Sequence, residues 1–140
     1  MDSNTIDMFI LNKGKFFPDS SLMLIRERLA NYDDSFTTRL LSANFKNPTI
    51  GFLYSIGLGV YGIDRFYLGH VFTGVLKLIL TLAFLVTYVF LVFDDDPNLV
   101  AVICFFILSI GVLVWYITDI FKISKEIKEY NYTYLLTILY

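Results

Sequence analysis

Four charged residues stand inside or directly beside the apolar part of this sequence, and they are the first candidates for chemistry. Asp64 and Arg65 are neighbours, Lys77 falls near the start of an apolar stretch, and Asp119 directly follows another. An ionisable group next to lipid is costly to hold, so it pairs with a partner, reaches the membrane interface, or lines a path for ions or protons. The competing interpretations are therefore a structural ion pair, a lysine that reaches the interface, and a transport site.

The spacing of Lys77 and Asp119 predicts that they lie at a similar depth. Lys77 precedes Asp94 by 17 residues, and Asp119 follows Asn98 by 21 residues. If the two stretches form an antiparallel hairpin that turns between Asp94 and Asn98, both side chains come to the face opposite the turn, where they can pair. Asp64 and Arg65 belong at that same face, which predicts one charged cluster.

Arg65 needs an acceptor, because a guanidinium has five donors and keeps its charge. Asp64 is the nearest carboxylate in sequence, but adjacent side chains on a helix do not face one another. Asp119 is therefore the better predicted partner of Arg65, with Asp64 as the alternative.

Several other chemistries are excluded by what the sequence lacks. It shows no nucleophile beside a base, and the glycines of residues 57–69 do not precede the Lys-Ser/Thr pair of a phosphate-binding loop. A single cysteine, Cys104, and a single histidine, His70, form no metal-ligand cluster. The net charge of −2, the pI near 5.2 and the absence of a basic run argue against nucleic acid. We expect no enzyme activity, no metal, no cofactor and no nucleic-acid partner.

The composition indicates that lipid surrounds much of the chain. Its 140 residues are 56% hydrophobic and only 17% charged, with a mean hydropathy of +0.64, whereas soluble domains carry about 25% charged residues. We predict an all-α integral membrane protein of the cell membrane, with the lipid bilayer as its first partner.

Two apolar stretches have membrane length, and a third is marginal. Residues 71–93 are interrupted only by Lys77, and residues 99–118 carry no charge. Residues 49–63 are uncharged but barely long enough to cross a hydrocarbon core of about 30 Å. The sequence thus predicts two to three transmembrane helices in a multi-pass arrangement, and whether residues 49–63 cross or dip into the membrane stays open.

A stripe of small residues marks the marginal stretch. Gly51, Ser55 and Gly59 recur at every fourth position, which lets a second helix approach closely in lipid. The stripe predicts helix packing within a homo-oligomer or against another membrane protein.

Short amphipathic helices are predicted before the apolar part. The apolar residues Ile6 and Phe9, Ile25 and Leu29, and Phe36 and Leu40 are spaced for one face each of three such helices, with residues 33–35 capping the third. Three short helices cannot build much of a core alone, so we expect their faces to meet each other and the membrane surface or a partner subunit. The predicted domains are 1–46, a transmembrane part 47–121, and a C-terminal helical tail 122–140 whose tyrosines suit the interface or a subunit contact.

The segment between the first two apolar stretches is the most specific part of the sequence. It reads Gly62-Ile63-Asp64-Arg65-Phe66-Tyr67-Leu68-Gly69 and resembles the central motif of the TM2 domain family. Gly74–Leu78 is similar to the start of the family's next helix, and Val114–Phe121 to its closing segment, in which Trp115 is an expected interface anchor. The resemblance covers about residues 46–121, extends to a bacterial subgroup through residues 12–18, 25–29 and 45–48, and implies membrane location and fold rather than mechanism.

Three functions follow from this interpretation. The favoured one is a non-enzymatic membrane protein that acts by helix-helix assembly, as a homo-oligomer or with a membrane partner. An oligomeric ion-conducting or transporting protein is the first alternative, and a membrane-bound protective or regulatory partner of a toxin or secretion system is the second. The distribution of Lys and Arg favours a cytoplasmic C-terminus, whereas the side of the N-terminus stays open.

Overall fold

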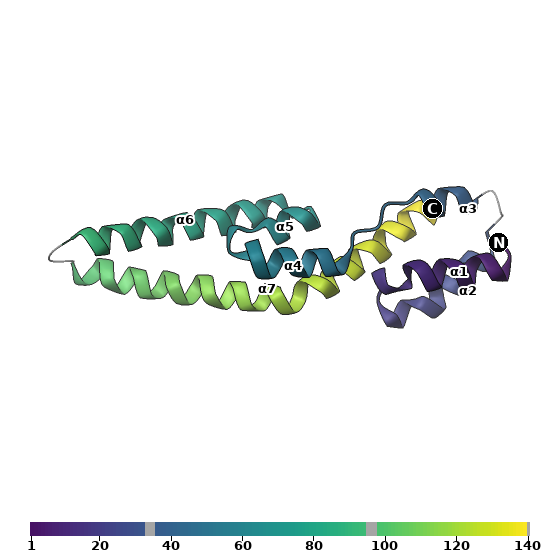
Figure 1. Ribbon diagram of the computed structural model, residues 1–140, viewed down its shortest axis with the longest axis horizontal. Coiled ribbons are helices and arrows are strands. Elements are labelled where there is room, and N and C mark those ends of the chain that lie inside the picture. The colour runs from purple at the N-terminus through teal and green to yellow at the C-terminus, as the bar shows by residue number, and fades with distance from the viewer. Residues whose placement is uncertain (33–35, 95–97, 140) are drawn as a thin grey trace. The chain divides into compact units, whose positions relative to one another are not determined.

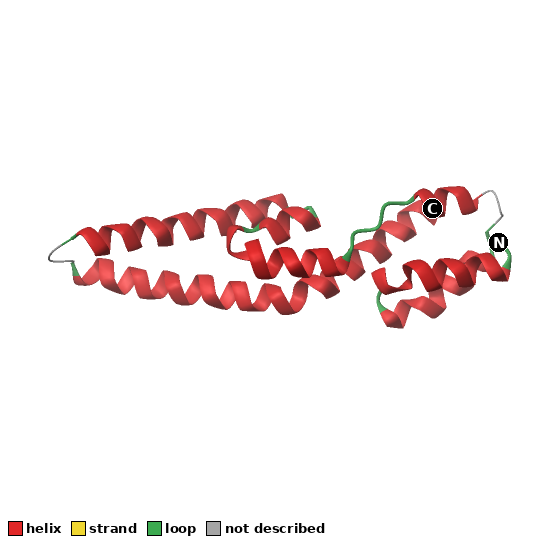
Figure 2. Ribbon diagram, viewed as in Figure 1, coloured by secondary structure: helices red, strands yellow, loops and turns green. Residues whose placement is uncertain are grey.

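A computed structural model describes residues 1–32, 36–94 and 98–139, and all regular structure in those ranges is helical (Figure 2). The prediction of an all-α membrane protein is confirmed. The predicted cap at residues 33–35 and the central residues of the predicted turn, 95–97, lie outside the described ranges. The elements are α1 Ser3–Lys13, η1 Gly14–Phe16, η2 Asp19–Ser21, α2 Leu22–Ala30, α3 Phe36–Ser42, α4 Pro48–Leu58, η3 Gly59–Tyr61, α5 Ile63–Leu68, α6 Val71–Phe93 and α7 Leu99–Leu139 (Figure 1).

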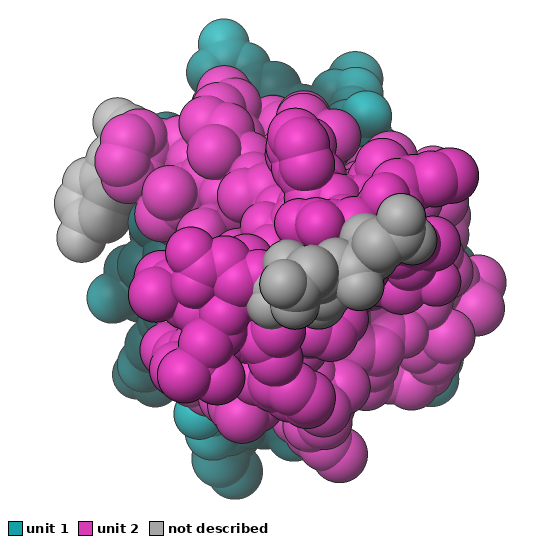
Figure 3. Space-filling model, turned by 90° about the vertical axis from the view of Figure 1, so that its left-hand side faces the viewer, with its two compact units in different colours: residues 1–48, 125–140 teal, residues 49–124 magenta. Residues whose placement is uncertain are grey.

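The chain forms two compact units, coloured separately in Figure 3. Unit 1 holds residues 1–48 together with 125–140, and unit 2 holds residues 49–124. The long helix α7 contributes its first part to unit 2 and its last part to unit 1. The structure therefore groups the N-terminal helices with the C-terminal tail, which the sequence interpretation kept apart.

Unit 1 has an apolar core to which both ends of the chain contribute. The expected faces of α1, α2 and α3 are buried, and Leu135 and Leu139 of α7 join them. The core consists of Ile6, Phe9, Phe17, Ile25, Leu29, Leu40, Phe45, Leu135 and Leu139. The leucines of the tail pack inside the chain, because the three short helices need a fourth to enclose their apolar faces. The expected place of its tyrosines at the interface or a subunit contact stays a prediction.

Asn131 ties the N-terminal segment to α7 within this core. Its side chain is fully buried, and its Nδ2 donates to the carbonyls of Phe16, at 3.0 Å, and Lys46, at 2.7 Å. Its Oδ1 accepts the backbone N–H of Lys46 at 2.9 Å. One side chain thus forms hydrogen bonds with three backbone groups of the segments before α2 and α4.

Unit 2 is built on the pair α6 and α7, which lie side by side and run antiparallel (Figure 1). Both are long and apolar enough to cross a membrane, and at 1.5 Å per residue the 23 residues of α6 extend about 34 Å. The rings of Phe84 and Phe105 stack between them at 5.3 Å. The two predicted membrane-length stretches are therefore helices that pack as a hairpin.

The marginal stretch does not form a continuous spanning helix. α4 has 11 residues, about 16 Å of helix and half of a hydrocarbon core. The backbone carbonyls at the end of α4 and in η3 need hydrogen-bond partners, because lipid supplies none. Tyr116 of α7 donates its hydroxyl to the Ile56 carbonyl at 2.8 Å, and Thr81 of α6 donates to the Val60 carbonyl at 2.7 Å. Side chains of the hairpin thus stabilise the helix end, and the described residues contain two candidate spans.

Candidate functional site: a buried charged cluster

The four charged residues singled out in the sequence meet inside unit 2. α5 supplies Asp64 and Arg65, α6 supplies Lys77, and α7 supplies Asp119. The side chains of Asp64, Lys77 and Asp119 are 0%, 3% and 2% exposed, whereas Arg65 is 11% exposed. We call these four residues the charged cluster. It joins three helices and has equal numbers of positive and negative groups.

Asp119 is the centre of the charged cluster. The Arg65 guanidinium contacts it through two nitrogens, with Nε donating to Oδ2 at 3.1 Å and Nη2 donating to Oδ1. Lys77 Nζ donates to the same Oδ2 at 2.7 Å. The pairing of Arg65 with Asp119 expected from the sequence is present, and so is the pairing of Lys77 with Asp119. Two cations on one carboxylate connect α5 and α6 to α7.

Asp64 occupies the other side of Lys77. Its two carboxylate oxygens lie 3.4 and 3.3 Å from Lys77 Nζ, beyond the 2.7–2.9 Å typical of charge-assisted hydrogen bonds. Burial raises the pKa of the Asp64 carboxyl above its ordinary value, although the charge of Lys77 opposes this shift. The guanidinium contact described above joins Arg65 to Asp119, the better predicted of its two partners.

The glycines of the motif allow α5 to pack closely on α6. Gly62 and Gly69 bound α5 and both have positive φ, 81° and 95°, a conformation that side chains disfavour. A Cβ on Gly62 would lie 2.6 Å from the Gly74 carbonyl oxygen, and one on Gly74 would lie 2.9 Å from the Phe66 ring. The backbones of Gly62 and Gly74 are in contact, and the Phe66 ring covers Gly74, so the motif positions Asp64 and Arg65 over Lys77.

The small-residue stripe on α4 is buried within the chain. Gly51, Ser55 and Gly59 are all buried, and a Cβ on Gly59 would lie 3.4 Å from both Ser55 Oγ and the Tyr116 ring. The stripe therefore packs inside unit 2, which differs from its predicted place at a contact with another subunit. Short α4 has to fit beside the hairpin, and small residues make the fit possible.

Other residues matter that the sequence interpretation did not single out. Three polar side chains donate hydrogen bonds to backbone carbonyls of the marginal stretch and of the loops: Thr81, Tyr116 and Asn131. A signal for Asn131 exists, because it interrupts a run of buried apolar residues at every fourth position: Ile127, Leu135 and Leu139. Thr81 and Tyr116 have no such signal. Trp115, the expected anchor, is half-buried on α7, whereas Cys104 is exposed.

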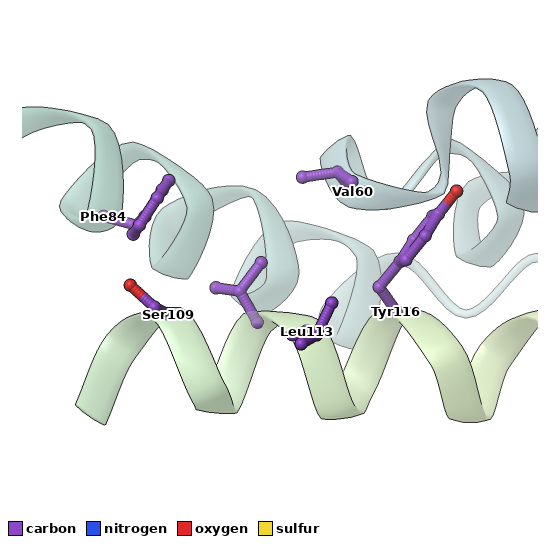
Figure 4. A pocket seen from close by; sticks show the side chains of 6 residues that line it. Val60, Phe84, Ser109, Leu113 and Tyr116 are labelled. Atoms are coloured by element: carbon purple, nitrogen blue, oxygen red, sulfur yellow. The ribbon is translucent and has the colours of Figure 1, made fainter. Parts of the chain in front are cut away.

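An apolar groove of about 380 Å³ lies on unit 2 (Figure 4). It forms between α6 and α7 next to η3, where α4 has ended. Its lining is Val60, Phe84, Ser109, Val112, Leu113 and Tyr116. The hydroxyls of Ser109 and Tyr116 already donate to the carbonyls of Phe105 and Ile56, so the groove offers apolar surface and few free polar groups.

These features define an all-α membrane protein whose helical hairpin is joined to a short glycine-bounded helix through buried charges. Residues 44–94 match the TM2 domain family, which confirms the resemblance over this segment. Three members of the charged cluster lie within the matched residues, and α7 adds Asp119 beyond them. For residues 95–121 the resemblance stays a prediction. Comparisons with curated proteins and with solved structures gave no match.

Proposed function

We propose that this membrane protein is not an enzyme and acts by helix-helix assembly, as a homo-oligomer or with another membrane protein. The observation that carries the proposal is the closure of the charged cluster on itself. Arg65 and Lys77 both contact Asp119, and Lys77 also faces Asp64. These charges fix three helices to one another, which gives a rigid unit that can present a constant surface to a partner.

The same observation weighs against the conducting alternative. A conducting oligomer places charged groups in a wet lumen, whereas Asp64, Lys77 and Asp119 are at most 3% exposed within a single chain. A conductive path along these residues would require the ion pairs to open.

The outer face of α7 is the surface that we propose for assembly. Ile103, Ile110 and Ile117 recur every seven residues and are 49%, 62% and 44% exposed. Gly111 lies beside this row, and nothing stands within 4 Å of where its Cβ would be. A seven-residue repeat keeps one face toward a partner helix, and missing side-chain volume permits the close approach on which association in lipid depends. A second copy fits this face best, because copies with the same topology place equal residues at equal depth.

Cys104 makes the assembly proposal directly testable. It is exposed and precedes Gly111 by seven residues, which places both on one face of α7, so oxidative cross-linking in native membranes should give a disulfide-linked dimer. The control is Cys104→Ser with a new cysteine at Val86, which is 54% exposed on α6 and should give little dimer. Native mass spectrometry in detergent should find an oligomer that Gly111→Leu dissociates. A monomer in the mass spectrum and no cross-link at Cys104 would reject assembly as a homo-oligomer.

An ion-flux assay separates assembly from conduction. The purified protein in liposomes should give no more flux of a dye-reported cation than empty liposomes do. Flux that depends on the protein and is lost in Asp119→Asn would support the conducting alternative instead.

We also propose that the C-terminus is cytoplasmic. α4 is too short to cross, which supports an arrangement with all 11 Lys and Arg residues on one side. In a Cys104→Ser background, a cysteine at Asn98 should react with an impermeant thiol reagent in whole cells, and one at Lys125 should react only after lysis. The opposite pattern would invert the proposed orientation.

A further inference from the structure

Asp64 is the least compensated member of the charged cluster. It is fully buried, and Lys77 Nζ lies 3.3 and 3.4 Å from its two carboxylate oxygens. The same Nζ lies 2.7 Å from Asp119. Asp119 also receives the Arg65 guanidinium. Asp119 therefore contacts both cations, whereas Asp64 shares Lys77 with it at a longer distance.

The distribution of charge with depth sharpens this imbalance. Arg65 is the most exposed member, with 11% of its side chain exposed, and the hydrogen bonds of its Nε and Nη2 go to Asp119. The three fully buried groups, Asp64, Lys77 and Asp119, would carry a net charge of −1 if all were ionised. An uncompensated charge in a dry site costs several kcal/mol in general, and such a group usually neutralises.

We propose that Asp64 binds a proton in the folded protein, so that the buried part of the charged cluster is one Lys77–Asp119 ion pair beside a neutral carboxylic acid. Among the described residues, Lys77 is the cation that faces the Asp64 carboxylate. The groups that act on Asp64 are Lys77 of α6, Asp119 of α7, and the backbone N–H of Arg65 on α5. The ionisable residues of α4 and η3 are the phenols Tyr54 and Tyr61. This inference is independent of the proposed assembly.

Ionisation of Asp64 would then weaken the unit. An ionised Asp64 competes with Asp119 for Lys77, and the repulsion between the two carboxylates adds to this effect. A folded state that holds the proton more tightly than the unfolded chain gains stability as the pH falls into the range where Asp64 becomes protonated. Its stability correspondingly declines as the pH rises through that range.

Infrared spectroscopy of the full chain in detergent tests the proton directly. A protonated-carboxyl band should persist to a higher pH than the bands of exposed aspartates. Asp64→Asn should remove it, and Asp19→Asn, at a side chain that is 89% exposed, should leave it unchanged. The absence of such a band, or its persistence in Asp64→Asn, would overturn the proposal.

Thermal unfolding is a second test, because the unfolding midpoint of Asp64→Asn should differ between a protonated Asp64 and an ionised Asp64 that forms a structural ion pair. Because Asn resembles the neutral acid, Asp64→Asn should unfold at the parent midpoint or above it and should lose part of the pH dependence. Asp119→Asn removes the carboxylate that both cations contact and should lower the midpoint by roughly 10 °C. An Asp64→Asn variant that fails to fold, or that loses as much as Asp119→Asn, would show that the ionised form is required and would reject the proposal.

Discussion

The two units bury opposite kinds of side chain. Unit 1 encloses large apolar residues and exposes most of its charges, as a domain in water does. In unit 2 most buried residues are small, polar or charged, with Leu68 and Ile123 as exceptions, whereas many large apolar side chains are exposed along α6 and α7. The buried residues of unit 2 are Gly51, Ser55, Gly59, Gly62, Asp64, Leu68, Gly74, Lys77, Thr81, Asp119 and Ile123.

The difference teaches which solvent each unit is built for. In water, apolar burial drives folding, so unit 1 needs a core. In lipid that drive is absent between helices, and close packing and polar contacts hold them together instead. In the most apolar 18-residue windows of α6 and α7, only 11% and 0% of the residues are buried inside the chain. This low burial fits helices that are surrounded by lipid. One chain therefore folds by two sets of rules.

The largest effect should come from removing the Asp119 carboxylate at the centre of the charged cluster. Asp119→Leu leaves Arg65 and Lys77 without their shared carboxylate and should cost about 3–5 kcal/mol. Arg65→Leu in the same chain should recover part of this loss, since one stranded charge is removed. A double-mutant cycle on unfolding in detergent measures the coupling, and simple additivity would refute the contact.

The surface pair of unit 1 is the control for that cycle. Arg26 lies 2.7 Å from Asp7, with side chains 57% and 47% exposed. Asp7→Leu should change the unfolding free energy by less than about 1 kcal/mol. Similar effects at Asp7 and Asp119 would show that burial does not distinguish the two pairs.

Two separate leucine substitutions, one in each unit, test whether the units are built for water and for lipid. Leu135→Ala, at a fully buried position of unit 1, should cost about 2–5 kcal/mol because it leaves a cavity. Leu82→Ala, at a position of α6 that is 50% exposed, should cost little, since lipid fills the space. Limited proteolysis of unit 1 and thermal unfolding in detergent should report the difference. A large loss from Leu82→Ala would instead indicate a packed protein contact at that face.

A glycine pair probes close packing within unit 2. Gly74→Ala places a Cβ 2.9 Å from the Phe66 ring and should cost about 1–3 kcal/mol through overpacking. Gly111→Ala meets nothing within 4 Å and should raise helix stability by up to about 1 kcal/mol. Thermal unfolding of the monomeric fraction in detergent compares the two. Equal effects would mean that Phe66 moves aside freely.

The smallest expected effect concerns the side-chain hydrogen bonds to backbone carbonyls of the marginal stretch. Thr81→Val removes the hydrogen bond to the Val60 carbonyl and should cost about 0.5–1.5 kcal/mol. Thr87→Val is the matched control on α6, because the Thr87 hydroxyl donates to Ala83 of its own helix at 2.8 Å. Hydrogen exchange at the end of α4 and in η3 should rise in Thr81→Val alone. No change there would mean that another donor replaces Thr81.

The sequence by itself determined the helices and the membrane, because both follow from local pattern. Apolar runs of membrane length predict α6 and the first part of α7, and the spacing of Ile25 and Leu29 predicts α2. The expected pairing of Arg65 with Asp119 also came from the sequence, since a guanidinium beside lipid needs hydrogen-bond acceptors and the hairpin brings a carboxylate to its depth.

Only the tertiary structure decided where the surfaces face. The α4 stripe has the same pattern whether it meets α7 of its own chain or a helix of another chain, and packing against Tyr116 settled it. The place of Leu135 and Leu139 in the core of unit 1 depends on contacts more than 90 residues apart in the sequence. The sharing of Lys77 between two carboxylates depends on fractions of an ångström. Spacing along a chain fixes which side chains share a helix face, but only packing fixes what that face touches.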